Sequence, residues 1–197
     1  MINVARVVNG DPAVDVRLTP KGQSEARLLG AQLRNVPLDV CIHSRFGRTR
    51  ETAEIALEGR AVPREVEPLF DDIVLGDLEG VSIDEYRAWK RRHRRSDPFP
   101  NGESLDAAAV RYGRAFTALL ARPEQRILLV THEIPVRYVL NAAEGSPDPD
   151  APHHAIANAT PYLFGEAQLA IAADRLRATN EALRAQSPPR PTCGNGP

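Results

Sequence analysis

Three clusters of polar residues each follow an apolar segment of this sequence, and together they hold the side chains that phosphate-ester chemistry needs. They are residues 44–49, the pair Asp71 and Asp72, and residues 131–133. Arg48 offers a planar guanidinium whose N–H groups match two phosphate oxygens. A carboxyl group such as that of Asp72 can protonate a leaving alkoxide, and an imidazole such as that of His132 can donate a hydrogen bond to a phosphoryl group. Phosphoryl transfer depends chiefly on positioning and charge compensation, which these side chains supply without a metal.

The elements that must position these side chains are strands that alternate with helices. Residues 38–43 and 126–131 are apolar and partly β-branched, which predicts two buried strands. A helix over residues 44–57 follows the first strand, and a helix with Pro135 in its first turn follows the second. This alternation indicates an α/β domain with a largely parallel sheet, in which ligands bind beyond the carboxyl ends of the strands. Ser44 and His132 both fall at that edge.

The remaining predicted elements complete one domain. Thr19 followed by Pro20 predicts the start of a helix that runs to about residue 35, and Ser104 predicts the cap of a helix that runs to residue 121. Further expected elements are a weak strand over 62–66, a helix over 83–95, a last strand over 161–164, and a terminal helix with Leu169, Leu176 and Leu183. We therefore expect a domain over residues 1–186 and a disordered tail over residues 187–197, where proline and glycine are frequent.

The order and spacing of several motifs resemble one known family. Residues 44–53 (Ser-Arg-Phe-Gly-Arg-Thr-Arg-Glu-Thr-Ala) resemble the Ser-Pro-Leu-x-Arg-Ala-x-Gln-Thr-Ala motif of the histidine phosphatase superfamily, the phosphoglycerate mutase-like proteins. Residues 18–22 are similar to that family's Leu-Thr-x-x-Gly helix start, and residues 72–80 to its Glu-x-x-x-Gly-x-x-Glu-Gly stretch. Further matching blocks are residues 102–104, 129–132 and 158–160. The resemblance covers residues 3–164 in the family's order.

The resemblance implies a three-layer sandwich around a mostly parallel sheet, and hydrolysis of a small phosphomonoester through a phosphohistidine. Arg48 corresponds to the arginine that clamps the phosphate, and His132 to the second active-site histidine, which donates to the phosphoryl group. Asp72 stands where the family has a glutamate that acts as general acid. The groups that line the family's phosphate pocket correspond to Asn3, Asn9 and Gly10. The resemblance implies no metal and no organic cofactor, and the expected partner is a small phosphorylated substrate or inorganic phosphate.

The family's nucleophile is missing from this sequence. It is a histidine in an Arg-His-Gly-Glu motif at the end of the first, central strand, and its position falls before Met1. The chain as written is therefore expected to be inactive, because the phosphohistidine pathway needs that side chain. Either the gene start is assigned to an internal methionine and the natural protein carries the missing strand, or the chain is a truncated form. We favour the first explanation, because loss of a central strand exposes the edges of both neighbours.

Several alternatives stay open at this stage. Asp72 serves either as a general acid or, with Asp71, as a turn cap. Glu133 stands where the family has a glycine, so its carboxylate must point away from the phosphate or pair with Arg137 or Arg48. The basic run over residues 90–95 is either a solvated helix end or a rim that attracts an anionic substrate. The short segment over 80–102 favours a phosphatase over a mutase, and a non-catalytic phospho-ligand binder or scaffold is the rival class.

Composition excludes other classes of protein. The chain has 197 residues with 25 Lys and Arg against 26 Asp and Glu, so its net charge of -1 argues against a nucleic-acid binder. It contains no apolar run that could cross a membrane and no secretory signal, so we expect a cytoplasmic protein. Two cysteines are too few for a disulfide framework or a zinc cluster. The leucine spacing of the terminal helix leaves a homodimer open.

Overall fold

The computed structural model describes residues 6–186, with side chains through residue 179, and its centre is a parallel sheet. The strands are β1 (Val40–His43), β2 (Arg64–Val66) and β3 (Ile127–Val130), in the order β2-β1-β3. Cys41 pairs with Arg64 on one side and with Leu128 on the other, so the three strands end at the same edge. Both strongly predicted strands are confirmed, and the weak one over 62–66 also forms.

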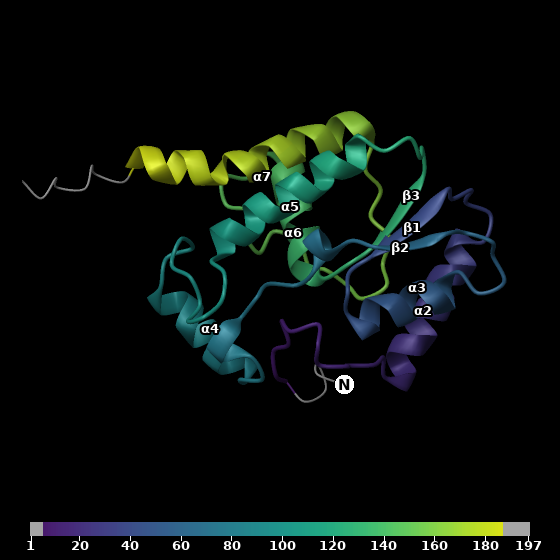
Figure 1. Cartoon of the computed structure of the whole chain (residues 1–197), viewed down its shortest axis with the longest axis horizontal. Coiled ribbons are helices and arrows are strands. Elements are labelled where there is room, and N and C mark those ends of the chain that lie inside the picture. The colour runs from purple at the N-terminus through teal and green to yellow at the C-terminus, as the bar shows by residue number, and fades with distance from the viewer. Residues whose placement is uncertain (1–5, 187–197) are drawn as a thin grey trace, which may run out of the picture.

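Helices cover both faces of this sheet (Figure 1). On one face lie α2 (Pro20–Leu33) and α3 (Gly47–Ala56), and on the other lie α5 (Leu105–Leu120), α6 (Glu133–Glu144) and α7 (Glu166–Gln186). Val40 and Ile42 of β1 join the core formed with α5, α6 and α7, whereas Cys41 packs in the cluster with α3. This alternation along one strand produces the three-layer α/β sandwich that the sequence predicts.

Capping residues define where the helices begin. The Thr19 hydroxyl accepts a hydrogen bond from the Gly22 amide, and the Ser104 hydroxyl accepts one from the Ala107 amide, so both predicted caps are confirmed. Helix α4 (Ile83–Arg92) begins with a capping box between Ser82 and Glu85. It ends at Arg92 rather than at the predicted residue 95, because the chain turns extended at residue 93.

The predicted last strand over residues 161–164 is wrong. These residues are irregular, and Leu163 is 96% exposed. A strand needs a neighbouring backbone with free N–H and C=O groups, and residues 161–164 make no ladder with any strand in the described part of the chain. Short apolar sequences with aromatic residues satisfy strand propensity, but pairing decides the structure.

The terminal helix α7 packs along α5. Leu176 is fully buried in the core, and Leu169 packs against it, while the side chain of Leu183 lies outside those described. A Cβ at Gly113 of α5 would lie 2.8 Å from the Ala173 carbonyl oxygen, so the close approach of these two helices requires glycine. Residues 187–197, expected as a tail, lie outside the described residues. Among the helices described, none has the length and apolar character to cross a membrane.

Candidate functional site

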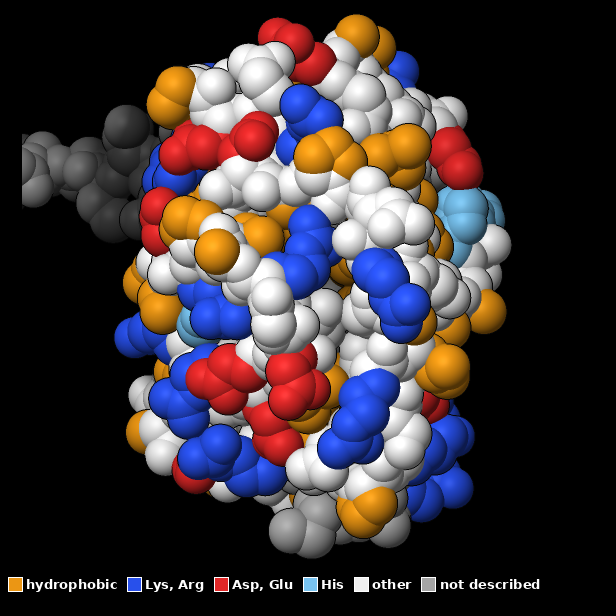
Figure 2. Space-filling view, turned by 90° about the vertical axis from the view of Figure 1, so that its right-hand side faces the viewer, with side chains coloured by type: hydrophobic (Ala, Val, Ile, Leu, Met, Phe, Trp, Pro, Cys, Tyr) orange, Lys and Arg blue, Asp and Glu red, His pale blue; other side chains and the backbone are white. Residues whose placement is uncertain are grey.

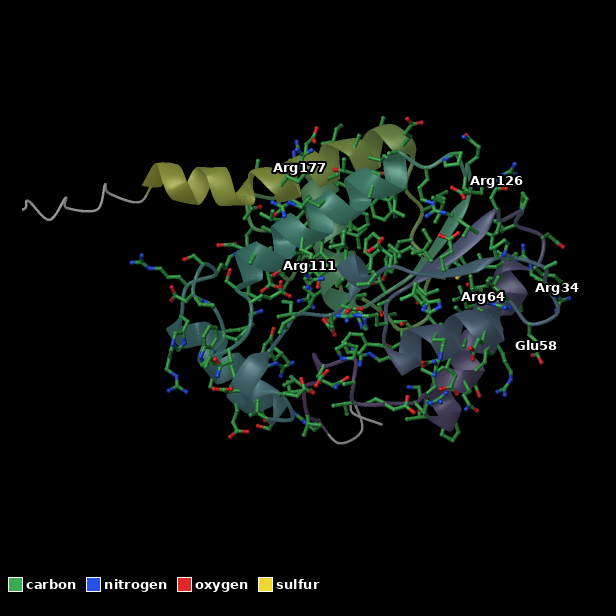
Figure 3. The ribbon with its side chains drawn as sticks, viewed as in Figure 1. Arg34, Glu58, Arg64, Arg111, Arg126 and Arg177 are labelled. Carbon is green, nitrogen blue, oxygen red and sulfur yellow. The ribbon has the colours of Figure 1, made fainter. Side chains whose placement is uncertain are left out.

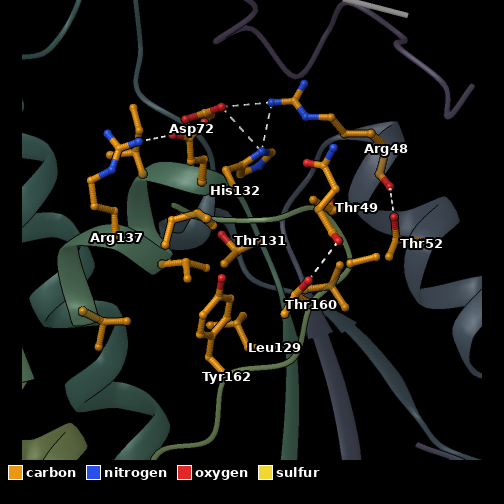
Figure 4. Close-up of a pocket in the computed structure, with 18 of the residues that line it drawn as sticks. Arg48, Thr49, Thr52, Asp72, Leu129, Thr131, His132, Arg137, Thr160 and Tyr162 are labelled. Carbon is orange, nitrogen blue, oxygen red and sulfur yellow. Dashed lines mark hydrogen bonds and ion pairs between the residues drawn. The ribbon is translucent and has the colours of Figure 1, made fainter. Parts of the chain in front are cut away.

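Arg48, Asp72 and His132 meet at the carboxyl edge of the sheet (Figure 4). Arg48 lies in the first turn of α3, His132 caps α6 directly after β3, and Asp72 follows the 3₁₀ turn Pro68–Phe70. One terminal nitrogen of Arg48, Nη2, donates to Asp72 Oδ2 at 3.0 Å and to His132 Nδ1 at 2.9 Å. Asp72 Oδ2 lies 3.5 Å from His132 Nδ1. The structure thus brings together three groups that lie 24 to 84 residues apart in the sequence.

The loop before α2 contributes Asn9 to the same cluster. Arg48 Nη1 donates to Asn9 Oδ1 at 2.6 Å, and Asn9 Nδ2 donates to Glu79 Oε1 at 2.8 Å. The Gly10 amide donates to the other Glu79 oxygen at 2.6 Å, so Gly10 lies beside the cluster with its N–H already used. Asn3 lies outside the described residues. Glu79, which holds both loop residues, was present in a matched motif but was not recognised as a positioning group.

Burial and charge set the protonation of the acidic and imidazole groups. Burial raises the pKa of Asp72 to about 6, although the adjacent Arg48 guanidinium opposes this rise. Burial together with the positive charges of Arg48 and Arg111 lowers the pKa of His132 well below its usual value. The site therefore holds a neutral imidazole beside a carboxyl group that can exchange its proton near neutral pH.

A buried hydroxyl pair lies behind His132. Its Nε2 is 2.8 Å from Ser44 Oγ, which is in turn 2.7 Å from Thr49 Oγ1. The Phe46 ring packs edge-on against the imidazole, with ring centroids 4.5 Å apart, and Arg48 lies 4.2 Å above the same ring. These contacts fix the imidazole from three sides. The resemblance assigned no role to Ser44 or Thr49.

Arg111 of α5, labelled in Figure 3, holds the loop that carries Asp72. Its guanidinium donates to the carbonyl oxygens of Leu69, Asp71 and Asp72 at 2.9, 3.0 and 3.2 Å, and it also pairs with Glu103. The Glu103 carboxylate in turn accepts from the Val74 amide at 3.0 Å. Nothing in the local sequence around Arg111 signals this role, because the loop that it holds is about 40 residues away.

Residues of the basic run over 90–95, and Glu133, form ion pairs. Lys90 pairs with Asp150, Arg137 pairs with Asp150 and with Glu133, and Arg95 pairs with Asp106 and Asp148. Of the two partners expected for Glu133, its carboxylate pairs with Arg137, and its side chain is 59% exposed. On the face that Figure 2 presents, basic and acidic side chains are interspersed.

A cavity of about 1430 Å³ extends from this cluster along β3. Its polar end is lined by Arg48, Asp72 and His132, and Lys90 of α4 also lines it. The remaining wall mixes apolar and polar residues, and its apolar part along β3 and α5 includes Ile127, Leu129, Phe116 and Leu119. In the part of the chain that the structure describes, no three His, Cys, Asp or Glu side chains are grouped as a metal site requires. The cluster can therefore bind an anion at one end of a cavity whose wall is partly apolar.

Comparison with protein families and sequences gives one consistent result. The family model for the histidine phosphatase superfamily (branch 1) matches residues 3–169. A probable phosphoglycerate mutase, GpmB, of Erwinia tasmaniensis is 30% identical over 153 residues, which cover 74% of this chain and 70% of that protein. An adenosylcobalamin/alpha-ribazole phosphatase of Salmonella typhimurium is 32% identical over 140 residues, which cover 66% of this chain and 68% of that protein.

Solved structures agree with these relatives. The Bacillus stearothermophilus protein YhfR has a TM-score of 0.67 and 30% identity, and the match covers 84% of this chain and 82% of that one. The alpha-ribazole phosphatase of Shigella flexneri has a TM-score of 0.65 and 26% identity, with coverage of 74% and 75%.

Proposed function

The chain belongs to the histidine phosphatase superfamily, and from this premise we propose that its full-length form hydrolyses a small phosphomonoester through a phosphohistidine. The observation that carries the proposal is the meeting of Arg48, Asp72 and His132 at one end of an open cavity. These groups supply a phosphate clamp, a proton donor and a hydrogen-bonding imidazole. Two matched relatives are named as a phosphatase and as a probable mutase. Only the single helix α4 occupies the segment over residues 80–102, which favours hydrolysis over mutase activity.

In the first step a histidine nitrogen attacks phosphorus while the substrate's P–O bond breaks. Arg48 and the His132 imidazole bind the phosphoryl oxygens and offset their charge. Asp72, in its protonated form, transfers its proton to the departing alkoxide oxygen. In the second step water attacks phosphorus, the P–N bond breaks, Asp72 takes a proton from the water, and phosphate leaves. Each group then returns to its starting protonation state.

We place the nucleophilic histidine on a strand that pairs with the outer edge of β3. In the described residues β3 pairs only with β1, and Ile127, Leu128 and Leu129 on it are partly exposed. An apolar strand edge of this kind is normally covered, whereas the opposite edge strand β2 is exposed and carries Arg64 and Glu65. A parallel strand beside β3 would end next to His132, so a residue after it would reach the cluster. We propose that this strand precedes Met1 in the natural polypeptide.

The test compares the present chain with a chain extended by the in-frame codons upstream of Met1. The extended chain should hydrolyse p-nitrophenyl phosphate, and the 197-residue chain should not. Substituting Arg48→Ala or His132→Ala in the extended chain should reduce turnover at least about 100-fold, because each removes a group that contacts the transferred phosphoryl. The matched control is Arg45→Ala, since Arg45 is 54% exposed and pairs with Asp71 outside the cluster.

Two outcomes would count against this function. A stop codon directly upstream of Met1 would remove the proposed source of the nucleophile and favour a phosphate-binding role without chemistry. Full activity of the extended Arg48→Ala variant would show that the cluster is not the phosphate site.

A further inference from the structure

The hydrogen bonds around His132 determine which of its ring nitrogens carries the proton. A guanidinium nitrogen can only donate, so Arg48 Nη2, at 2.9 Å from Nδ1, requires an unprotonated Nδ1. The proton of the neutral ring then lies on Nε2, which donates to Ser44 Oγ at 2.8 Å. This arrangement makes Ser44 the acceptor for the imidazole.

The chain of donors continues beyond Ser44 without a gap. The Ser44 hydroxyl donates to Thr49 Oγ1 at 2.7 Å, and the Thr49 hydroxyl donates to the Phe46 carbonyl oxygen at 2.9 Å. Ser44 is fully buried, and Thr49 is 3% exposed. Ser44 Oγ also accepts from the Phe46 amide at 3.4 Å, and the Ser44 carbonyl oxygen is a second acceptor for the Thr49 hydroxyl at 3.2 Å. The Arg48 contact at the far end sets the direction in which the two hydroxyls point.

We propose that Ser44 is a positioning residue that accepts the Nε2 proton of His132 and so stabilises the Nε2–H form, in which the Nδ1 lone pair faces Arg48. Both hydroxyls can also point the other way, because each can either donate or accept. When an anion takes over the Arg48 contact, the ring takes a proton on Nδ1 from water in the cavity and gives up the proton on Nε2 to water. Thr49 then donates to Ser44, Ser44 donates to Nε2, and the Nδ1 proton faces the anion. The reversal needs no change in the charge of the ring.

Only the reversal of the hydroxyl chain on anion binding rests on the proposed phosphate site. The resting arrangement follows from the contacts of Arg48, Ser44 and Thr49 alone. It deepens the proposed function because a histidine that is to donate to a phosphoryl oxygen through Nδ1 must first be released from its acceptor role.

The test is nitrogen NMR of the uniformly ¹⁵N-labelled 197-residue chain, with His132 assigned by comparison with His132→Gln. At neutral pH the unsubstituted chain should show a pyrrole-type Nε2 and a pyridine-type Nδ1. In Ser44→Ala the Nε2–H group loses its buried acceptor while the Arg48 contact remains, so the preference should weaken and both nitrogen resonances should move toward each other. Thr52→Ala is the matched control. The Thr52 hydroxyl lies on α3, as that of Thr49 does, and it donates to the Arg48 carbonyl oxygen, so the His132 spectrum should not change.

Saturating orthophosphate should then move the pyrrole-type resonance to Nδ1 in the unsubstituted chain. A protonated Nδ1 in the phosphate-free chain, or an unchanged spectrum in Ser44→Ala, would overturn the role of Ser44. A doubly protonated ring in the phosphate complex would overturn the reversal of the hydroxyl chain. If orthophosphate shifts no resonance of His132 or Arg48, the proposed phosphate site fails, whereas the phosphate-free spectra still decide the role of Ser44.

Discussion

At the scale of the residue, Asp72 combines two influences that act on its proton in opposite directions. Burial disfavours the carboxylate, while the Arg48 guanidinium at 3.0 Å favours it. Burial is the larger influence, and it raises the pKa of Asp72 to about 6. A carboxyl group with this value is protonated often enough near neutral pH to act as an acid and then as a base. This supports the general-acid role over the turn-cap role for Asp72.

The raised pKa of Asp72 predicts a pH dependence of stability in the 197-residue chain. Because the folded state holds the proton more tightly than the unfolded state, the stabilisation is complete below the unfolded pKa of about 4 and is lost as the pH rises through about 6. Between about pH 5 and pH 7.5, the free energy of unfolding of the unsubstituted chain, measured with urea, should fall by about 1–2 kcal/mol more than that of Asp72→Asn. The control is Asp174→Asn. Because this carboxyl group is exposed, its removal should leave the change in the free energy of unfolding with pH as it is in the unsubstituted chain.

A free energy of unfolding that rises with pH over this range would show that the Arg48 pairing outweighs burial. In that case Asp72 is a fixed carboxylate that cannot deliver a proton to an alkoxide. The general-acid role would then require another group. In the extended chain the same titration should appear as activity that falls when the pH rises above about 6.

At the scale of the element, the sequence predicted those parts whose signals are local. The apolar runs of β1 and β3 and the caps Thr19 and Ser104 each depend on a few adjacent residues, and all were found. The predicted strand over 161–164 was wrong because a strand depends on a partner elsewhere in the chain. The same limit applies to the site. Arg48, Asp72 and His132 were found through motifs, whereas Arg111 and the Ser44 hydroxyl act through contacts that no motif describes.

Substitution of Arg111 tests how far α5 positions the loop that carries Asp72. Substituting Arg111→Met should lower the free energy of unfolding by about 2–4 kcal/mol, because it removes a hydrogen-bond donor from three loop carbonyl oxygens and the charged partner of the part-buried Glu103 carboxylate. The matched control is Arg114→Met on the exposed side of the same helix, which should change stability by less than about 0.5 kcal/mol. Both can be measured by chemical denaturation.

A loss confined to stability would make Arg111 a structural residue only. If it also positions Asp72, the pH-dependent loss of stability described above should shrink in Arg111→Met. Equal stability of the Arg111 and Arg114 variants would contradict both roles.

At the scale of the whole molecule, the two edges of the sheet differ in kind. The β2 edge is exposed and charged, as is usual for a strand that faces water. The β3 edge is apolar and borders a cavity whose walls come from α5, α6 and residues 156–164. Arg48, Asp72 and His132 line the same cavity, so the proposed strand would both cover the β3 edge and bring the proposed nucleophile to these residues. A strand along β3 would also give residues 161–164 a neighbouring backbone.

The chain extended upstream of Met1 should therefore gain stability as well as activity. A strand paired with β3 adds backbone hydrogen bonds and covers the side chains of Ile127 and Leu129, which together should contribute about 3 kcal/mol or more to the free energy of unfolding. The 197-residue chain should bind the dye ANS in the open cavity, and the extended chain should not. Substituting Arg48→Ala in the extended chain should leave this gain in place, because Arg48 lies at the polar end of the cavity. An extended chain that still binds ANS and unfolds at the same denaturant concentration would show that the added segment lies elsewhere, and β3 would then be a natural edge of the sheet.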